Sequence, residues 1–258
     1  MIFLVCRGFS GTYVSTTYLF QILLLYLQTL VTTSKTWADE RVKTASRWAS
    51  SVFPLGTQTI LRRREQEFDP QGLSQNATKR QREFAAGRSC AAVLLNRWNI
   101  TEEVGVAKDR SPIWPDGFVG SISHSDRWVW AAVAKSEDRP AIGIDTEIVV
   151  SSETCDMLDN DIVTQPERLV IESLGLNPQV AFTLAFSAKE AFYKCWYPIT
   201  KSFFEFKQVA IQSCTTDTIR IASLESNPNF NTSPAWLDVH YLATDCDVFT
   251  ATWMEQKA

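Results

Sequence analysis

Apolar and polar residues alternate with a period of two in several short runs of this chain, which is the pattern of half-buried β-strands. Residues 120–124 and 128–134 flank a short polar turn and indicate the two arms of a hairpin, and residues 142–148 indicate a strand that follows it. After Lys201 the alternation returns at Phe203, Phe206, Val209, Ile211 and Ile219, and again over residues 236–241 and 248–253. We therefore expect a hairpin and a strand in the middle of the chain and a set of strands at its end.

Other stretches repeat apolar residues every three or four positions, as helices do. The first begins with Asn76 as its N-cap and runs to about Trp98. Its apolar face is made of Phe84, Ala91, Leu94, Leu95 and Trp98. Residues 149–180 indicate a linker and then a helix that opens at Pro166 and ends at Gly175. Strands and helices of these lengths predict a mixed α and β architecture.

The beginning of the chain carries the weakest pattern. The apolar stretch over residues 18–31 is interrupted by two glutamines, and it is shorter than the about 20 residues that a membrane-spanning helix needs. A single Arg7 precedes it and no small-residue cleavage site follows, so a secretory signal peptide is not favoured. We expect residues 1–45 to be an extension without a membrane span. Residues 46–75 are expected to hold a short strand or helix between loops.

Composition narrows the function classes. The chain has 258 residues and a net charge of −4, which gives no basic surface for a nucleic acid. It has only two histidines, so a histidine-rich zinc site is nearly excluded. Its six cysteines are widely scattered without a C-x-x-C pair, which favours reduced thiols in a cytoplasmic protein over a zinc ribbon or a redox motif.

The strand over residues 142–148 carries two acids in an otherwise apolar run. Asp145 and Glu147 are two positions apart and so point to the same side of a strand. Two carboxylates this close repel each other unless a cation lies between them. Mg²⁺ is usually held by one or two carboxylates together with phosphate oxygens, so these acids are candidate magnesium ligands. The alternative is a strand end whose acids face water.

Several residues before this strand suit a phosphate-bearing ligand. Arg80 and Arg88 lie about two turns apart on the first helix, and Gly87 between them permits a close approach to the backbone. Residues 110–115 form a loop stiffened by two prolines, in which Arg110 and a tryptophan can hold an anion and a flat ring. Ser121, Ser123 and His124 add hydroxyl and imidazole groups at the end of the first hairpin arm. A solvated basic face is the alternative for the arginines, and a structural hydrogen bond is the alternative for His124.

A third helix is expected over residues 186–198, where Pro198 ends it. Glu190 and Lys194 are four positions apart on this helix and share a face away from its apolar stripe. Taken alone, these residues are better explained by an ordinary helix ion pair, and Ser187 with Glu190 has the spacing of a capping box.

The order and spacing of these motifs resemble a known family. Residues 120–124 (GSISH), 143–147 (GIDTE) and 186–194 (FSAKEAFYK) look like the signature motifs of the 4′-phosphopantetheinyl transferases. Residues 79–88 and 110–115 narrow the resemblance to the enterobactin synthase component D type. The likeness covers roughly residues 50–212, and it extends neither to the first 45 residues nor to the final strands.

The resemblance implies an enzyme that transfers the phosphopantetheine arm of coenzyme A to a serine hydroxyl of an acyl or peptidyl carrier protein, releasing 3′,5′-ADP. It implies that Asp145 and Glu147 bind Mg²⁺ and that Glu190 is either a third metal ligand or the base that accepts the serine proton. Lys194 would hold a pyrophosphate oxygen, and Asp145, Glu190 and Lys194 would be the catalytic residues. The coenzyme A cradle implied by the resemblance consists of Arg80, Arg88, Arg110, Ser123, His124 and Lys194.

The fold implied is α+β, with two similar α/β-sandwich subdomains related by a pseudo-twofold axis and the substrate in the crevice between them. On this basis we expect an N-terminal subdomain over residues 46–150 and a C-terminal subdomain over residues 151–258. No clear internal repeat of the sequence accompanies this symmetry. We further expect a cytoplasmic monomer that acts in siderophore biosynthesis or in another secondary-metabolite or fatty-acid pathway, with no nucleic acid or membrane partner.

Two other functions are open. A Mg²⁺-dependent phosphohydrolase also uses clustered acids with a lysine, but it needs further metal ligands or a nucleophilic aspartate and leaves the arginine helix without a role. The second alternative is a non-catalytic module that binds coenzyme A or a carrier protein but has lost its catalytic activity. The presence of Asp145, Glu147, Glu190 and Lys194 argues against it.

Overall fold

The computed structural model describes residues 40–64, 77–224 and 236–256. The chain divides into two compact units, residues 1–43 and 44–258, and the architecture below is that of the second unit. The apolar stretch over residues 18–31, the Asn76 N-cap and the last part of the loop region over residues 46–75 fall outside the described residues. Within the described residues, no helix has the length and hydropathy to cross a membrane.

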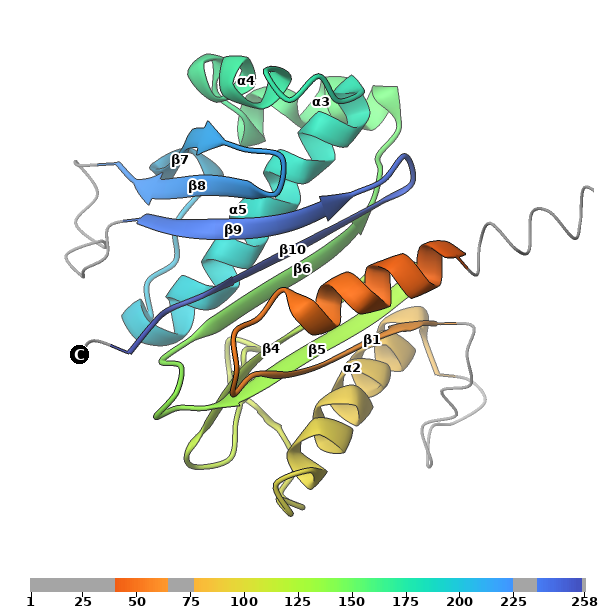
Figure 1. Ribbon diagram of the computed structural model, residues 1–258, viewed down its shortest axis with the longest axis vertical. Helices are drawn as coiled ribbons and strands as arrows, with labels where there is room; N and C mark the ends of the chain where they lie inside the picture. The colour runs from red at the N-terminus through yellow and green to blue at the C-terminus, as the bar shows by residue number, and fades with distance from the viewer. Residues whose placement is uncertain (1–39, 65–76, 225–235, 257–258) are drawn as a thin grey trace, which may run out of the picture. The chain divides into compact units, whose positions relative to one another are not determined.

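A three-stranded antiparallel sheet forms the first half of this unit (Figure 1). Its strands are β1 (Gln58–Arg63), β5 (Trp128–Lys135) and β4 (Phe118–His124), in that spatial order. Alternate residues of β5 face opposite sides. Val129, Ala131 and Val133 pack against the long helix α2 (Lys79–Asn96), whereas Trp130 points away from it. The hairpin expected from the alternating pattern is therefore confirmed.

A five-stranded antiparallel sheet forms the second half, in the order β6–β10–β9–β8–β7. Its strands are β6 (Ile142–Ile148), β7 (Val209–Cys214), β8 (Thr218–Ser223), β9 (Trp236–Ala243) and β10 (Asp247–Trp253). Helix α5 (Pro178–Thr200) covers one face of this sheet, and α3 (Ser152–Ile162) and α4 (Gln165–Glu172) pack beside α5 (Figure 1). Short elements complete the fold: β2 (Gly105–Val106), β3 (Pro112–Ile113) and the 3-10 helix η1 (Phe206–Gln208).

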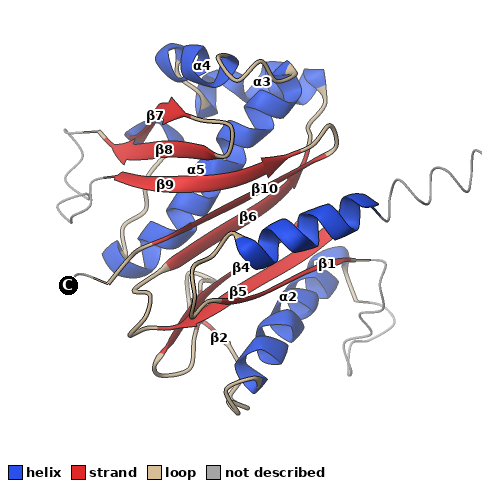
Figure 2. Ribbon diagram, viewed as in Figure 1, coloured by secondary structure: helices blue, strands red, loops and turns tan. Residues whose placement is uncertain are grey.

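The two sheets meet where β4 lies beside β6 (Figure 2). No backbone ladder joins these two strands in the described part of the chain. Instead, the Ser121 hydroxyl accepts a hydrogen bond from the Ile144 amide at 3.2 Å, and the Ser123 hydroxyl accepts one from the Thr146 amide at 3.3 Å. Serine hydroxyls thus replace backbone carbonyls as acceptors for these two β6 amides, and a row of polar side chains remains between the sheets.

Helix α5 approaches β6 closely because Gly143 has no side chain. A Cβ atom at this position would overlap the carbonyl oxygen of Ala191 and lie 2.7 Å from the amide nitrogen of Cys195. Gly143 shares the α5-facing side of β6 with Asp145 and Glu147, because these residues alternate along the strand. The close approach therefore brings the polar residues of α5 against the two acids.

Aromatic side chains cover the other face, where residues 44–51 form part of a helix. The Trp48 ring lies 5.7 Å from that of Trp130 in β5 and 6.5 Å from that of Phe249 in β10. Phe53 contacts Trp130 and Trp253 in the same way, with centroid distances of 6.4 and 5.4 Å. These rings bridge the two sheets from the side opposite α2 and α5 and fix their relative position.

The structure corrects several expectations for the first helix. It begins after Thr78, which caps it in a capping box with Gln81, and it ends at Asn96, before Trp98. Phe84 is 46% exposed and does not belong to the buried face, which Ala91, Leu94 and Leu95 do form.

The linker expected after residue 149 contains α3, which the sequence analysis missed, whereas the helix opening near Pro166 is confirmed as α4. The third helix begins at Pro178 with Asn177 as its N-cap, so Ser187 lies in its interior and is not a cap. It continues through Pro198 to Thr200, because Pro198 lies in its last turn and a left-handed Lys201 (φ 53°) ends it.

The mixed α and β fold class is confirmed, with one long helix on each sheet. The pseudo-twofold relation between the halves stays a prediction. The strand β6, which the sequence analysis assigned to the N-terminal subdomain, pairs with β10 in the second sheet.

Candidate functional site

Asp145 lies at the centre of the polar row between the sheets and is 2% exposed. Its Oδ1 atom accepts hydrogen bonds from Ser123 Oγ at 2.8 Å and from Lys194 Nζ at 2.6 Å. Its Oδ2 atom accepts one from Ser187 Oγ at 2.8 Å. A buried carboxylate with three donors, one of them cationic, is held in one orientation.

Two hydroxyls fix the donors around Asp145. Thr250 on β10 donates to the Ser187 carbonyl at 2.9 Å, and the two hydroxyl oxygens lie 2.9 Å apart. The Ser123 hydroxyl also lies 3.2 Å from Lys194 Nζ. The carboxylate is therefore built into a network that reaches from β4 through β6 to α5 and β10.

Lys194 belongs to this network and is also accessible from a cavity. Its side chain is 26% exposed, and it lines the large cavity described below. Burial alone lowers the pKa of the Lys194 ammonium, but the carboxylates of Asp145 and Glu190 outweigh that effect and raise the pKa above its ordinary value. Lys194 therefore remains a cation with donor capacity toward the cavity.

The other two acids carry the excess negative charge of the site. Burial and the neighbouring Asp145 raise the pKa of Glu147 to about 8, and burial raises the pKa of Glu190. One ammonium faces three carboxylates from β6 and α5, so a further cation is favoured here. Carboxylate oxygens are the ligands that Mg²⁺ prefers, and in this respect Asp145, Glu147 and Glu190 fit it.

The three acids are not already arranged as a metal site. Across residues 40–64, 77–224 and 236–256, no group of three or more His, Cys, Asp or Glu residues is arranged as a metal site. Lys194 and two serines are the immediate neighbours of the Asp145 carboxylate. The donor set is thus suited to a divalent cation that brings further oxygen ligands with it.

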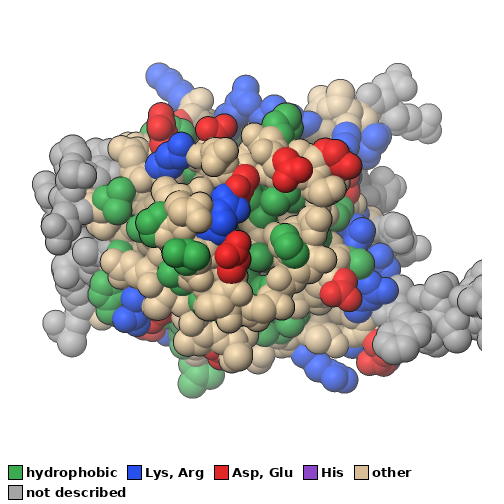
Figure 3. Space-filling view, turned by 90° about the horizontal axis from the view of Figure 1, so that it is seen from above, with side chains coloured by type: hydrophobic (Ala, Val, Ile, Leu, Met, Phe, Trp, Pro, Cys, Tyr) green, Lys and Arg blue, Asp and Glu red, His purple; other side chains and the backbone are tan. Residues whose placement is uncertain are grey.

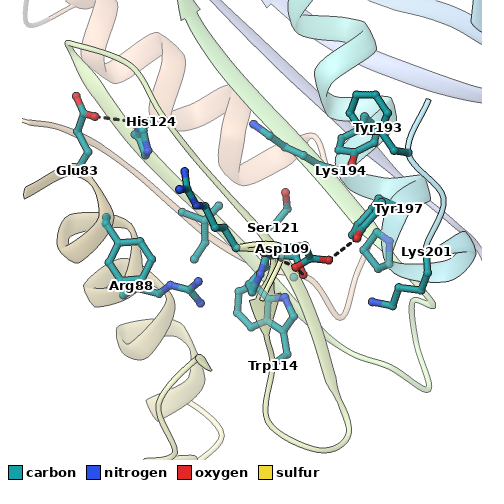
Figure 4. A pocket seen from close by; sticks show the side chains of 18 residues that line it. Glu83, Arg88, Asp109, Trp114, Ser121, His124, Tyr193, Lys194, Tyr197 and Lys201 are labelled. Atoms are coloured by element: carbon teal, nitrogen blue, oxygen red, sulfur yellow. Dashed lines mark hydrogen bonds and ion pairs between the residues drawn. The ribbon is translucent and has the colours of Figure 1, made fainter. Parts of the chain in front are cut away.

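A cavity of about 650 Å³ opens beside Lys194 (Figure 4). Its volume is in the range of pockets for small ligands and cofactors. Cationic side chains line it, together with His124 and with aromatic rings from both halves of the unit: Arg88, Arg110, Lys194, Lys201, Phe84, Trp114, Tyr193, Tyr197 and Phe203. Cations beside aromatic faces suit a ligand that combines phosphate groups with a planar base.

Four of the residues expected in the cradle line this cavity, namely Arg88, Arg110, His124 and Lys194. Arg80 does not line it, and its side chain is exposed near the beginning of α2. Ser123 does not line it either, because its hydroxyl is turned to Asp145. Ser121, two positions earlier on the same strand, is the serine that does.

Local structure positions the two lining arginines. Gly87 lets α2 pack onto β4, since a Cβ atom there would lie 2.5 Å from Ile122 Cγ2. Arg88, next in the helix, donates to the Val104 carbonyl at 3.2 Å and lies over the Phe84 ring at 4.9 Å. Burial lowers the pKa of Arg88, but a guanidinium remains charged. Arg110 has a φ of 71°, an unusual value for a residue other than glycine.

Two residues that line the cavity are joined by a hydrogen bond that the sequence did not suggest. The Tyr197 hydroxyl on α5 donates to Asp109, the residue before Arg110 (Figure 4). Asp109 also accepts from the Ser111 amide at 3.0 Å and hydroxyl at 2.7 Å. These bonds lower the pKa of Asp109 to about 2, the Tyr197 bond most of all. The Arg110 loop is thereby tied to the helix that carries Lys194.

Ser187 and Glu83 are further site residues that sequence reasoning missed. Ser187 had a usable signal, since it lies seven positions before Lys194 and therefore on the same helix face. Glu83 lines the cavity one turn before Arg88. An acid beside the arginines that line the cavity gave no recognisable pattern.

A second cavity of about 380 Å³ lies on the other side of Tyr193 and is lined by Glu190, Phe203 and Phe204. The face over α3 and α4 differs from both cavities, because acidic, basic and hydrophobic side chains are interspersed over it without a dominant charge (Figure 3).

Two protein-family models match this chain. A family model described as the 4′-phosphopantetheinyl transferase N-terminal domain matches residues 69–134. A second, described as the 4′-phosphopantetheinyl transferase superfamily, matches residues 141–243. Together they include the arginine helix, the hairpin and the acidic strand with its helix.

Individual relatives are enterobactin synthase components and 4′-phosphopantetheinyl transferases. Enterobactin synthase component D of Salmonella typhi is 36% identical over 118 residues, which are 46% of this chain and 49% of that protein. The Escherichia coli K12 protein of the same name is 36% identical over 122 residues, 47% of this chain and 57% of that protein. A 4′-phosphopantetheinyl transferase of Mycobacterium tuberculosis is 29% identical over 184 residues, 66% of this chain and 78% of that protein. The chain thus spans about half the length of the first of these relatives.

Proposed function

This chain belongs to the 4′-phosphopantetheinyl transferase superfamily, and from this premise we propose that it transfers the phosphopantetheine arm of coenzyme A to a carrier-protein serine. The observation that carries the proposal is the position of Lys194. Its ammonium is bound to Asp145 and also faces a cavity lined by cations and aromatic rings. A cavity whose cationic lining suits phosphates thus lies beside a group of carboxylates, which supports the proposal.

Coenzyme A matches the cavity in its chemistry. Its adenine is a flat ring for Phe84, Trp114 or the tyrosines, and its phosphates are partners for Arg88, Arg110 and His124. Lys194 is positioned to hold an oxygen of the diphosphate and so to stabilise the charge that develops on the leaving 3′,5′-ADP. Tyr193 and Phe203 line both the large cavity and the second one, which Glu190 also lines and which offers space for the rest of the molecule.

The transfer forms a bond between the serine Oγ of the carrier protein and the phosphorus of the arm. It breaks the bond between that phosphorus and the oxygen of ADP, and the serine proton leaves. Glu190 is the candidate acceptor of this proton, because burial moves the pKa of its carboxyl upward, toward the range in which a base works near neutral pH. Glu190 as a third metal ligand is the alternative assignment.

Asp145, Glu147 and Glu190 would hold Mg²⁺ together with oxygens of the bound diphosphate. When bound, the cation neutralises charge on the phosphates. Without a diphosphate, Lys194 and the two serines satisfy Asp145. Acyl or peptidyl carrier proteins, a role in siderophore biosynthesis, a monomeric state and a cytoplasmic location belong to the same proposal.

The test is to incubate the protein with an apo carrier protein, coenzyme A and Mg²⁺ and to measure the intact mass of the carrier. We expect the mass to increase by one phosphopantetheine arm, with release of 3′,5′-ADP. Release of 3′,5′-ADP without a mass increase would identify a phosphohydrolase. Binding of coenzyme A with neither product would identify a binding module. No mass increase across several carriers contradicts the proposal.

A further inference from the structure

Glu83 is an acid inside a cavity that the proposed function fills with phosphates. Its side chain on α2 is 12% exposed and lines the cavity beside Arg88 and His124. A carboxylate in this position repels an anionic ligand unless its charge is balanced, so its presence requires an explanation.

Two cationic side chains, Arg64 and Lys79, balance the charge of Glu83. Arg64, at the end of β1, donates to Glu83 Oε1 at 2.9 Å and to the Ser125 carbonyl at 3.3 Å. Lys79 lies 3.9 Å from the same Glu83 oxygen. Asp126 pairs with Lys79 and lies 3.6 Å from Arg64. Two acids and two bases thus compensate each other behind the cavity wall.

His124 is the group that this cluster presents to the cavity. Its Nδ1 atom lies 3.8 Å from Glu83 Oε2, the oxygen that is not bonded to Arg64 (Figure 4). His124 is the last residue of β4 and its side chain is 41% exposed, so core packing does not hold the ring in place. Arg64 fixes the chain on both sides of this contact, through Glu83 and through the carbonyl that follows His124.

We propose that Glu83 is a positioning residue that orients the His124 imidazole for coenzyme A. By facing Nδ1, the carboxylate leaves Nε2 directed to a phosphate oxygen in the cavity, as a carboxylate does for a histidine ligand in other sites. Arg64 keeps the Glu83 carboxylate in place and reduces its repulsion of the ligand. The inference rests on the proposed function, because the phosphate ligand is coenzyme A.

The first test is kinetic. Glu83→Gln retains the shape of the side chain but loses its charge, and we expect the KM for coenzyme A to rise about tenfold with kcat within about twofold of the wild type. In a His124→Asn background the same substitution should change KM by less than about twofold, because the residue on which Glu83 acts is absent. Glu102→Gln, at an exposed position, is the matched control and should change neither constant.

The second test does not depend on activity. The chain has two histidines, so long-range ¹H–¹⁵N spectra can distinguish the His124 ring from that of His240, which stacks on Trp253 far along the chain. We expect Glu83→Gln to shift the ring nitrogens of His124 and to leave those of His240 unchanged. If Glu83→Gln does not fold, Glu83→Asp can be measured in the same two experiments. Aspartate retains the negative charge but is one methylene shorter, so its carboxylate lies farther from the His124 ring.

Three results would overturn the inference: an unchanged KM in Glu83→Gln, an equal KM increase in the His124→Asn background, or unchanged His124 ring signals. The second would indicate that Glu83 contacts the ligand directly. In each case the wild-type protein still modifies the carrier. A wild type that neither binds coenzyme A nor modifies any carrier would instead contradict the proposed function.

Discussion

Helix α5 carries two lysines that each pair with a buried carboxylate, and the pairs differ in what remains unsatisfied. Lys189 Nζ donates to Glu167 at 2.6 Å, to the Ile162 carbonyl at 2.8 Å and to the Phe206 carbonyl at 3.0 Å, and its side chain is 0% exposed. Lys194, five positions later, binds Asp145 but remains 26% exposed on a cavity. We call these the closed pair and the open pair.

The closed pair uses all its hydrogen-bonding capacity inside the protein. Glu167 Oε1 also accepts from the Ile211 amide at 2.9 Å, and Oε2 accepts from the amide and hydroxyl of Thr164. It therefore joins α4, α5, η1 and β7. The open pair has a similar charge and burial at its carboxylate end, but its cation can reach a ligand. Residual donor capacity next to a cavity, and not the presence of a buried ion pair, is what distinguishes a candidate catalytic lysine from a structural one.

The largest effect is expected from breaking the closed pair. Lys189→Met leaves Glu167 buried without its cation and should lower the free energy of unfolding by about 3 to 5 kcal/mol. Urea unfolding followed by tryptophan fluorescence measures this. The double variant Lys189→Met/Glu167→Gln should recover much of the loss, because no uncompensated charge remains. A single variant as stable as the wild type would show that the pair is not the structural element we describe.

Breaking the open pair should lower activity strongly and stability only slightly. Lys194→Met is expected to lower kcat/KM for coenzyme A by about 100-fold, as loss of one charged donor at a reacting centre does. Its loss of stability should be less than half that of Lys189→Met, because Ser123 and Ser187 still donate to Asp145. Steady-state kinetics and urea unfolding of both variants together provide the comparison. Equal losses of stability would remove the distinction between the pairs.

The acids around the open pair should make stability depend on pH. Glu147 has a pKa of about 8 in the folded protein, above its ordinary value near 4.5. The folded state retains a proton that the unfolded state releases, so stability falls as pH rises from about 4.5 to about 8. Without Mg²⁺, Glu147→Gln should therefore gain about 1 to 2 kcal/mol over the wild type at pH 8 relative to pH 5. Urea titrations in EDTA measure this, with Glu102→Gln as the control. A gain that does not depend on pH would contradict the assignment.

The smallest effect is expected from breaking the hydrogen bond between Tyr197 and Asp109, which both line the cavity beside Lys194. Tyr197→Phe removes the hydrogen bond to Asp109 and retains the ring, so the Arg110 loop loses its link to α5. We expect coenzyme A to dissociate about two to five times faster, which corresponds to less than about 1 kcal/mol. Stopped-flow displacement measures this rate. Slower dissociation would mean that the bond hinders the bound state.

The sequence was sufficient where the signal was local. Alternating residues predicted β4, β5 and β6, and the spacing of Glu190 and Lys194 placed them on one helix face. It failed where the partner is distant in the chain. Ser187 resembled a helix cap until α5 was seen to begin nine residues earlier at Pro178, and its hydroxyl is used by an acid of β6.

Burial of Asp145 was equally hidden from the sequence. From the sequence, Asp145 is a candidate metal ligand with no part in the core. The carboxylate instead accepts three hydrogen bonds at 2% exposure, so alanine would remove the acceptor that Lys194 and two serines share. Asp145→Asn is the better probe, because it removes the charge and retains the shape.

The most direct test of the account is the intact mass of an apo carrier protein after incubation with coenzyme A, Mg²⁺ and either the wild type or Asp145→Asn. We predict that the wild type adds one phosphopantetheine arm and that the variant adds none in the time that the wild type needs for completion, although both proteins unfold cooperatively. Equal modification by the two proteins would contradict the central role of Asp145 and its open pair with Lys194.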